Sequence, residues 1–583
     1  MFKRLVSGTL LVLLLTGLFA LTFNIRTVKG TWTGTVYIRA DGSIDPPDAP
    51  IQRDGNVYTL TGNIASSADG IVVERDNIVI DGAGYTLQGT GSGGGIDLYG
   101  RKNVTVQNTR IDNFASGIGQ SRYSPINMVH GIRVLKNTIT NNRCGVSFIY
   151  SYNNIIIENN ITNNYYGISL SYSFNNTISR NNITENIHPG AELSDGIELF
   201  NSNYTFILGN NILANEFSGI ELYGGSSNNI ISGNSIKANV EGVSLWESTN
   251  NTISGNFIVA NEDYGISLID SSNNTIIENE ITKNDMTTIS SGIELSSSDG
   301  NIIKRNNISD NTYGIKIAYF STYNVVAEND ITANVYYGMA FSPDSSYRNI
   351  IYHNNFIGNT WGHVNTWEIF VNVWDNGYPS GGNYWSDYTG IDANGDGIGD
   401  TPYTIDANNV DRYPFMAPLK IFEAQHWDGV TYNFHVVSNS SILNFELSES
   451  LIPEIPSKIS LNVSGPGNTN GFLRMIIPNI IVQDLWQGNY MVLLNGEPWP
   501  FRNWTDNTNT YIYINYTHSE HEIKIIPEFP SALILPLFMI LTVIAIVFAK
   551  KKTYKNRNLN PKPHFSHIIR FSLPIFQSDL MLT

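Results

Sequence analysis

The repeat that decides the fold is seen most clearly in Gly219-Ile-Glu-Leu-Tyr-Gly-Gly-Ser-Ser-Asn-Asn-Ile-Ile-Ser-Gly-Asn-Ser-Ile-Lys-Ala-Asn239. The next copy starts at Gly242 and keeps the pattern G-[IV]-x-L, then N-x-I, then N-x-I-x-x-N. Ile and Leu alternate with polar residues at a period of two, which predicts short strands rather than a helix. The Asn-rich corners are typical of turns, because Asn tolerates the left-handed backbone conformation.

Two series of asparagines set the register of the repeat. The first series runs from Asn108 to Asn354, and the second, from Asn113 to Asn359, lies five residues after each member of the first. Three short strands in each period of about 22–25 residues predict one coil of a parallel β-helix. Identical side chains would then stack at about 4.8 Å, so each Asn could bond to the next in a ladder along the axis. A leucine-rich repeat is the competing solenoid, but no segment shows the helical period that it requires.

The composition fits this interpretation. Of the 583 residues, 41% are hydrophobic, which excludes a disordered chain, and only 15% are charged. Stacked coils would bring like charges together, whereas neutral Asn, Ser and Thr can repeat without repulsion. The net charge of −17 argues against a nucleic-acid-binding protein, because the phosphate backbone would be repelled. The single cysteine, Cys144, excludes an internal disulfide framework.

Both ends of the chain carry targeting features. Lys3 and Arg4 precede an apolar run to Phe23, which predicts a secretory signal peptide or an uncleaved anchor. Ser531–Ala549 is uncharged and is followed by three lysines, which predicts a transmembrane helix with the lysines in the cytoplasm. The segment between these ends, 30–549, has a net charge of −27. We therefore expect an exported, cell-surface protein that is anchored in the cytoplasmic membrane, and several Asn-x-Ser/Thr sequons make it a candidate glycoprotein.

The segment before the apolar run adds a resemblance. Pro527-Glu528-Phe529, a membrane helix and a basic cluster together resemble the sorting signal of archaeal surface proteins that archaeosortases process. The 31 residues after Lys552 depart from that pattern.

The repeat itself resembles the carbohydrate-binding and sugar-hydrolase type of β-helix found in NosD-like periplasmic proteins. The resemblance extends to the closing runs Gly381-Gly-Asn-Tyr-Trp-Ser-Asp-Tyr388 and Asp411-Arg-Tyr-Pro-Phe-Met-Ala-Pro418. It implies a right-handed, single-stranded parallel β-helix of about 11–13 coils. NosD-like proteins are linked to copper delivery, but here His is scattered and Cys144 has no Met or His nearby, so the sequence does not support copper.

The chain after the repeat changes character. Seven strand-like runs in about a hundred residues predict an immunoglobulin-like β-sandwich without a cysteine pair. The expected divisions are a signal peptide (1–29), an N-terminal cap (30–70), β-helix repeats (71–360), a closing segment (361–418), the sandwich as a spacer (419–526), the transmembrane helix (531–549) and a basic tail (550–583).

The first candidate site is a loop in the closing segment. Oxygen ligands that alternate around a glycine turn suit Ca²⁺, but the bidentate Glu of an EF-hand is replaced by Tyr403. An Asx-turn cluster without metal is the competing interpretation. The expected ligands are Asp392, Asn394, Asp396, the carbonyl of Ile398, and Asp400.

The second candidate is a strip on the outer face of the β-helix. Carboxylates stand two residues after several repeat glycines, and aromatic residues stand four after, which is how proteins often hold sugars. The predicted carbohydrate-binding residues are Glu198, Phe200, Glu221, Tyr223 and Trp246; Asp97 and Glu294 occupy equivalent positions. Neighbouring coils would place Glu198 and Glu221 about 5 Å apart, near the separation of the carboxylates in retaining glycosidases. A solvated face with stacked aromatics is the alternative.

Three classes of function stay open. The signature motifs of polygalacturonases are absent from the sequence, so catalysis has no identified residues. A surface protein that binds a polysaccharide, an envelope glycan or an envelope protein is the first interpretation. The alternatives are a carbohydrate-active enzyme (a hydrolase, lyase or epimerase) and a copper-maturation accessory protein.

Overall fold

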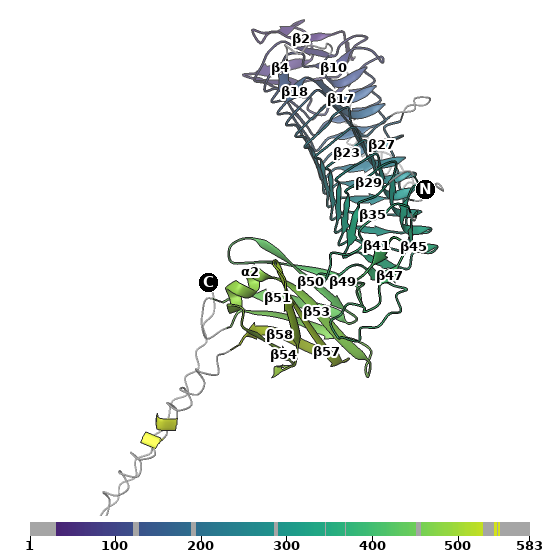
Figure 1. Ribbon diagram of the computed structural model, residues 1–583. Coiled ribbons are helices and arrows are strands. Elements are labelled where there is room, and N and C mark those ends of the chain that lie inside the picture. Colours follow the sequence, from purple (N-terminus) through teal and green to yellow (C-terminus); the bar gives the residue numbers. More distant parts are fainter. Residues whose placement is uncertain are drawn as a thin grey trace, which may run out of the picture.

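The computed structural model describes residues 31–120, 128–187, 194–284, 290–343, 346–367, 369–450, 456–528, 542–544 and 546–547. The predicted signal peptide, most of the predicted transmembrane segment and the basic tail lie outside these residues. No helix within the described residues is long and apolar enough to cross a membrane. The described chain forms a long β-solenoid followed by a domain of two antiparallel sheets (Figure 1).

The predicted parallel β-helix is confirmed, with about 12 turns. Each turn contributes one strand to each of three parallel sheets, which contain 15, 15 and 14 strands. The turn quoted above contains β27 (Ser218–Tyr223), β28 (Ile230–Ser232) and β29 (Ser235–Lys237). The other turns repeat this arrangement from β7 (Ile71–Val73) to β45 (Gly362–Asn365). Buried Ile, Val and Leu side chains fill the interior as one continuous core.

The asparagine ladders are present and almost fully buried. Asn234 Nδ2 donates to Asn256 Oδ1 (2.9 Å) and to the carbonyl of Ile207 (2.9 Å). The backbone N–H of Asn210 in turn donates to Asn234 Oδ1 (2.9 Å). Each Asn thus satisfies backbone groups that the corner of a turn would otherwise bury unpaired.

The first predicted ladder positions were wrong by one residue. Strand pairing places Asn137 beside Thr109 rather than Asn108, and the N–H of Thr109 donates to Asn137 Oδ1 (3.0 Å). Likewise, the N–H of Phe114 donates to Asn142 Oδ1 (2.9 Å), so Asn113 is not a member of the second ladder. Asn108 and Asn113 instead have positive φ angles of 52° and 59°, which Asn tolerates at turns.

Antiparallel strands cover the N-terminal end of the solenoid, and the closing segment (361–418) covers the other end. At the N-terminal end, β2 (Val36–Ile38) pairs with β3 (Ile44–Asp45) and β4 (Ile51–Asp54) pairs with β5 (Val57–Leu60), both antiparallel. At the other end, the closing segment covers the core with two fully buried tryptophans, Trp374 and Trp385. Trp385 Nε1 donates to the buried carboxylate of Asp411 (2.9 Å).

The C-terminal domain contains two five-stranded antiparallel sheets that share one apolar core. All seven strands expected from the sequence are present, with three further strands and one helix, α2 (Asn479–Trp486). The strands are β49 (Leu419–Gln425), β50 (Thr431–Ser438), β51 (Ser441–Ser448), β52 (Lys458–Ser464), β53 (Asn470–Pro478), β54 (Tyr490–Leu494), β55 (Glu497–Pro498), β56 (Arg502–Thr505), β57 (Asn509–Thr517) and β58 (His521–Pro527).

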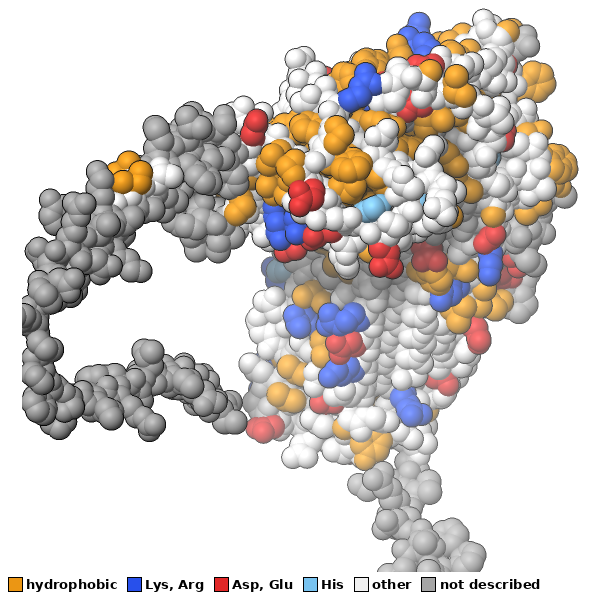
Figure 2. Space-filling model, turned by 90° about the horizontal axis from the view of Figure 1, so that it is seen from below, with side chains coloured by type: hydrophobic (Ala, Val, Ile, Leu, Met, Phe, Trp, Pro, Cys, Tyr) orange, Lys and Arg blue, Asp and Glu red, His pale blue; other side chains and the backbone are white. Residues whose placement is uncertain are grey.

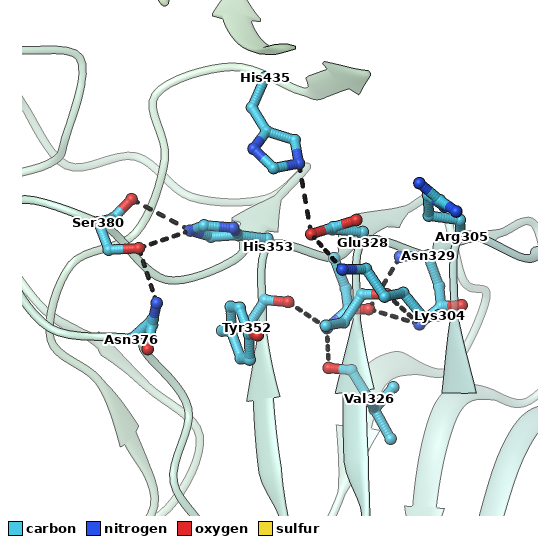
Figure 3. Close-up of polar contacts among 12 residues, drawn as sticks. Lys304, Arg305, Val326, Glu328, Asn329, Tyr352, His353, Asn376, Ser380 and His435 are labelled. Carbon is cyan, nitrogen blue, oxygen red and sulfur yellow. Dashed lines mark hydrogen bonds and ion pairs between the residues drawn. The ribbon is translucent and has the colours of Figure 1, made fainter. Parts of the chain in front are cut away.

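Polar contacts join this domain to the solenoid. His435 of β50 points at Glu328, which also pairs with Lys304 (3.1 Å), while His353 bonds to Ser380 (Figure 3). Although burial acts in the opposite direction, the bonds from His435 and Lys304 lower the pKa of Glu328 to about 2. Glu328 is therefore charged at neutral pH and forms an ion pair with Lys304 beside His435.

The surface of the protein is mostly uncharged, in agreement with the low content of charged residues. Figure 2 shows that most of the visible face is uncharged, and that acidic and basic side chains are scattered over it rather than gathered in one patch.

Candidate functional site

Most of the predicted sugar-binding strip lies at one cavity. This acidic–aromatic pocket has a volume of about 280 Å³. Its lining includes four of the five predicted residues, and no Lys or Arg is among the described residues that line it. The lining residues are Tyr166, Asp195, Glu198, Phe217, Glu221, Tyr223, Glu241, Ser244, Trp246 and Ile269.

Strand register brings these residues together. β24 (Ile197–Phe200), β27, β30 (Glu241–Trp246) and β33 (Tyr264–Ile269) are consecutive neighbours in one parallel sheet. Glu198 pairs directly with Glu221, and Phe200 pairs with Tyr223, as the repeat spacing predicted. The Ile and Leu residues between them are fully buried, so the carboxylates face outward by strand alternation.

Two carboxyl groups in the pocket affect each other's protonation. Asp195 is buried, and the charge of Glu221 disfavours its ionisation. Burial, followed by the charge of Glu221, raises the pKa of Asp195 well above its ordinary value, and burial also raises the pKa of Glu221. The N–H of Ser218 donates to Asp195 Oδ1 (2.9 Å) and fixes its orientation.

A third acid is held by a tyrosine. The hydroxyl of Tyr223 donates to Glu198 Oε1 (2.5 Å), and burial and this bond raise the pKa of Tyr223. Trp246 stands at the opening with 51% of its surface exposed. The pocket thus combines carboxyl oxygens, which accept hydrogen bonds from hydroxyl groups, with an aromatic face that an apolar surface can cover.

Glu241 is the fourth acid, and its oxygen Oε2 is buried without a hydrogen-bond partner. Burial raises its pKa from 4.5 to about 7. The folded chain holds this proton more tightly than the unfolded chain. Protonation of Glu241 therefore stabilises the folded state, and this stabilisation is present in full below about pH 4.5. That contribution is lost as the pH rises through about 7.

We therefore expect Glu241→Gln to raise the free energy of unfolding at pH 8 by about 2 kcal/mol and to leave it nearly unchanged at pH 4.5. Urea unfolding at both pH values measures the difference. Glu247→Gln, which replaces an exposed carboxylate one residue after the same strand, serves as the control. An equal effect of Glu241→Gln at both pH values would show that the charge of Glu241 is not the cause.

The sequence interpretation missed three lining residues that share one position. Tyr166, Asp195 and Glu241 each stand immediately before a repeat glycine. The predicted strip uses only positions after the glycine, although a column of Asp, Ser, Glu and Tyr stands directly before it in the sequence. Phe200 is not in the lining and instead packs against Tyr223, with ring centroids 4.8 Å apart.

The other two carboxylates of the predicted strip are placed apart from the pocket. Asp97 is buried in β10 (Gly94–Asp97), near the N-terminal end. Glu294 accepts two bonds from Lys316 Nζ (3.2 Å each) in the next turn. Neither residue lines the acidic–aromatic pocket.

In the predicted calcium loop, the carboxylates accept hydrogen bonds from the loop itself. Asp392 accepts from the N–H groups of Gly395 (2.7 Å) and Gly397 (2.8 Å), and Asp400 accepts from Asn394 Nδ2 (2.8 Å). Asp396 Oδ1 accepts from the N–H of Ile398 (2.9 Å). These are the bonds of an Asx-turn cluster. Calcium binding here stays a prediction.

Residues 49–186 and 125–281 match the family model for a right-handed β-helix region. Residues 225–390 match the model for NosD, a periplasmic copper-binding protein. The resemblance to NosD-like β-helix proteins is confirmed. The search of curated proteins gave no match.

Several solved structures are similar to this chain at low sequence identity. The periplasmic alginate epimerase AlgG is 16% identical (TM-score 0.34; 56% of this chain and 78% of that chain covered). The A-module of the Azotobacter vinelandii mannuronan C-5 epimerase AlgE6 is 16% identical (TM-score 0.33; 59% and 90% covered). The tailspike protein of E. coli bacteriophage HK620, in complex with a pentasaccharide, is 11% identical (TM-score 0.36; 85% and 87% covered).

The NosD match raises the question of copper. Within the described ranges, no group of three or more His, Cys, Asp or Glu side chains is placed to hold a metal ion. Desolvation raises the pKa of the Cys144 thiol to about 12, whereas a copper ligand would be a thiolate. The donor set of the described residues therefore does not fit a copper site.

Proposed function

We propose that this NosD-like β-helix protein binds carbohydrate in the acidic–aromatic pocket. The observation that carries the proposal is the cavity in which Trp246 and Tyr223 stand beside Glu198, Glu221 and Glu241. Carboxyl oxygens can accept hydrogen bonds from sugar hydroxyl groups, while the aromatic ring covers the apolar face of the sugar.

Trp246→Ala should weaken the binding of a glycan at least tenfold, which corresponds to about 1.4 kcal/mol. A glycan array identifies a ligand for the full-length protein, and isothermal titration then compares the wild type with the variant. Trp361→Ala is the matched control, because Trp361 is 62% exposed and lies outside the pocket. Failure of every glycan to bind, or equal binding by the wild type and Trp246→Ala, would contradict the proposal.

A second candidate function is hydrolysis of a glycosidic bond in the same pocket. The carboxyls of Glu198 and Glu221 favour it, because they stand on directly paired residues of neighbouring strands and burial raises the pKa of Glu221, as a general acid requires. Release of reducing ends from the bound glycan by the wild type, and its loss in Glu221→Gln, would distinguish hydrolysis from binding alone.

We further propose that the protein is exported and held at the cell surface. The support is the sequence: the basic start with an apolar run, and Ser531–Ala549 followed by three lysines. The two-sheet domain, for which we retain the immunoglobulin-like interpretation, would then be a spacer between the membrane and the β-helix. In this position the pocket would meet an envelope glycan or an external polysaccharide.

A further inference from the structure

A second cavity lies where the C-terminal domain packs against the last coils of the solenoid. Its volume is about 560 Å³, and residues of both the solenoid and the C-terminal domain line it. We call it the junction cavity. Its size is that of a site for a small molecule, and such sites often form between domains. The junction cavity and the acidic–aromatic pocket share none of the described residues that line them.

The solenoid contributes to this cavity one corner residue from each of four successive coils. These residues directly follow the consecutive neighbours β34 (Thr275–Ile277), β37 (Ile302–Lys304), β40 (Val325–Ala327) and β43 (Ile350–Tyr352) of one parallel sheet. The register pairs the last residues of these strands, so the corner residues stack at about the strand spacing of 4.8 Å. In chain order they are Glu278, Arg305, Glu328 and His353. Since the three coils before them have glycine at this corner, the polar column belongs to the last coils alone.

Glu328 and His353 follow neighbouring strands, and each has a buried acceptor atom without a partner among the described residues (Figure 3). The side chain of Glu328 is only 4% exposed; its Oε1 faces Lys304 and His435, while Oε2 accepts no hydrogen bond. His353 is 5% exposed, and its Nε2 faces the carbonyl oxygen of Ser380 (3.1 Å). Because a carbonyl oxygen only accepts, Nε2 carries the hydrogen and Nδ1 is an acceptor. Burial lowers the pKa of His353 to about 3, so the ring is neutral. Both residues therefore call for a donor from a ligand.

Arg305 offers the opposite kind of group. Its Nη1 pairs with Glu423 of β49 (3.2 Å) and its Nη2 pairs with Glu278. Its Nε is buried, and no described residue accepts a hydrogen bond from it. A buried N–H or carboxylate oxygen that stays unpaired costs free energy. The junction cavity thus presents two acceptors and one donor that a bound molecule could satisfy.

The charges and the apolar lining restrict the ligand further. Four acidic and two basic residues are among the described residues that line the cavity: Glu278, Glu328, Asp330 and Glu423 against Arg305 and Lys420. This excess of acids favours a cation. Phe422 of β49 and Ile442 of β51 add apolar surface from the C-terminal domain. Because no three described His, Cys, Asp or Glu side chains are placed to share a metal ion, an organic cation fits better than a metal.

We infer that the junction cavity binds a small organic cation that carries an ammonium group and a hydroxyl oxygen. The ammonium group donates to Glu328 Oε2 and His353 Nδ1, and the hydroxyl oxygen accepts from Arg305 Nε. The carbon chain between them lies against Phe422 and Ile442. This ligand is distinct from the carbohydrate proposed for the acidic–aromatic pocket, and neither proposal depends on the other.

The test is isothermal titration of the full-length protein with amino alcohols of two to six carbons, from ethanolamine to 6-amino-1-hexanol. At least one of them should bind about tenfold or more tightly than the diol of the same length, because a diol has no charge to pair with Glu328. Glu328→Gln should weaken this binding about tenfold or more. Glu247→Gln should leave it unchanged, since Glu247 is exposed and does not line the cavity.

Asn307→Lys is a second variant, needed because Glu328→Gln also removes an ion pair with Lys304. Asn307 is exposed at the start of β38 (Asn307–Ser309) and lines the cavity. A lysine there adds a positive charge and leaves the contacts of Glu328 in place, so it should weaken binding about fivefold. Thermal melts that match the wild type show that the variants are folded, and Asn307→Lys decides if Glu328→Gln melts lower.

The inference fails if no amino alcohol binds at millimolar concentration, if amino alcohols and diols bind equally, or if binding survives both variants. Amine binding that is lost in Trp246→Ala but kept in Glu328→Gln would place the amine in the acidic–aromatic pocket and overturn the junction site. Glycan binding in that pocket is measured separately, so the carbohydrate proposal can fail while the junction site stands, and the reverse.

Discussion

Asn234→Asp should lower the free energy of unfolding by about 3–5 kcal/mol at pH 8. Asn234 is buried, and its Nδ2 donates to the carbonyl of Ile207 and to Asn256 Oδ1. A carboxylate has no proton to donate, so these acceptors would face another acceptor and a buried charge. At pH 4 the penalty should be smaller, because a protonated Asp can restore one of the two bonds.

Urea unfolding of the full-length protein at both pH values measures this effect. Asn228→Asp is the control, because Asn228 is exposed in the same coil and its positive φ of 57° is one that Asp also tolerates. We expect that variant to change the free energy of unfolding by less than about 0.5 kcal/mol. A similar loss in both variants would mean that the ladder does not depend on the donor hydrogen of the buried amide.

Gly219→Ala should cost about 3 kcal/mol, although alanine adds only one methyl group. A Cβ at Gly219 would lie 2.8 Å from the carbonyl oxygen of Gly242 and 2.8 Å from Ile236 Cγ2. Both neighbours are fixed by the next coil and by the core, so neither can move away without breaking the parallel pairing. Glycine therefore recurs at this position of the repeat because consecutive coils approach too closely for a side chain.

Gly233→Ala provides the comparison in the same coil. Gly233 has a positive φ of 65°, and a Cβ there would meet nothing within 4 Å. Its cost should be only the strain of a left-handed alanine, about 1 kcal/mol. The two variants thus separate steric contact from backbone strain in one thermal or urea unfolding series, and a larger loss in Gly233→Ala would contradict the steric explanation.

Much of the fold could be predicted because the solenoid repeats one local rule. The period of the Asn series and the alternation of Ile with polar residues predicted three strands in each coil, which the three sheets confirm. The first predicted ladder position escaped this reasoning, because Asn108 occupies a turn position while Thr109 takes the place of the ladder residue. An Asn at a turn and an Asn in a ladder look alike in a sequence, and strand pairing is needed to tell them apart.

The candidate site was predicted in part for a related reason. Strand alternation identified Glu198 and Glu221 as outward residues, and their pairing is confirmed. Asp195 and Glu241 stand immediately before the repeat glycine, just before a strand and at the first residue of a strand respectively, outside the alternation that was counted from the glycine. Their raised pKa values arise from burial between coils, which depends on side chains that are more than twenty residues apart in the sequence.

The closed ends of the solenoid determine how long the rod can become. A stack of parallel strands has no internal reason to stop, since each end offers open N–H and C=O groups to the next copy of the protein. Here the first strand of one sheet is the two-residue β3, and that of another is β4, whose Gln52, Arg53 and Asp54 are exposed. Short antiparallel edges with charged side chains disfavour fibre growth, while Trp374 and Trp385 close the core at the opposite end. These two edges therefore disfavour the growth of the solenoid into a filament.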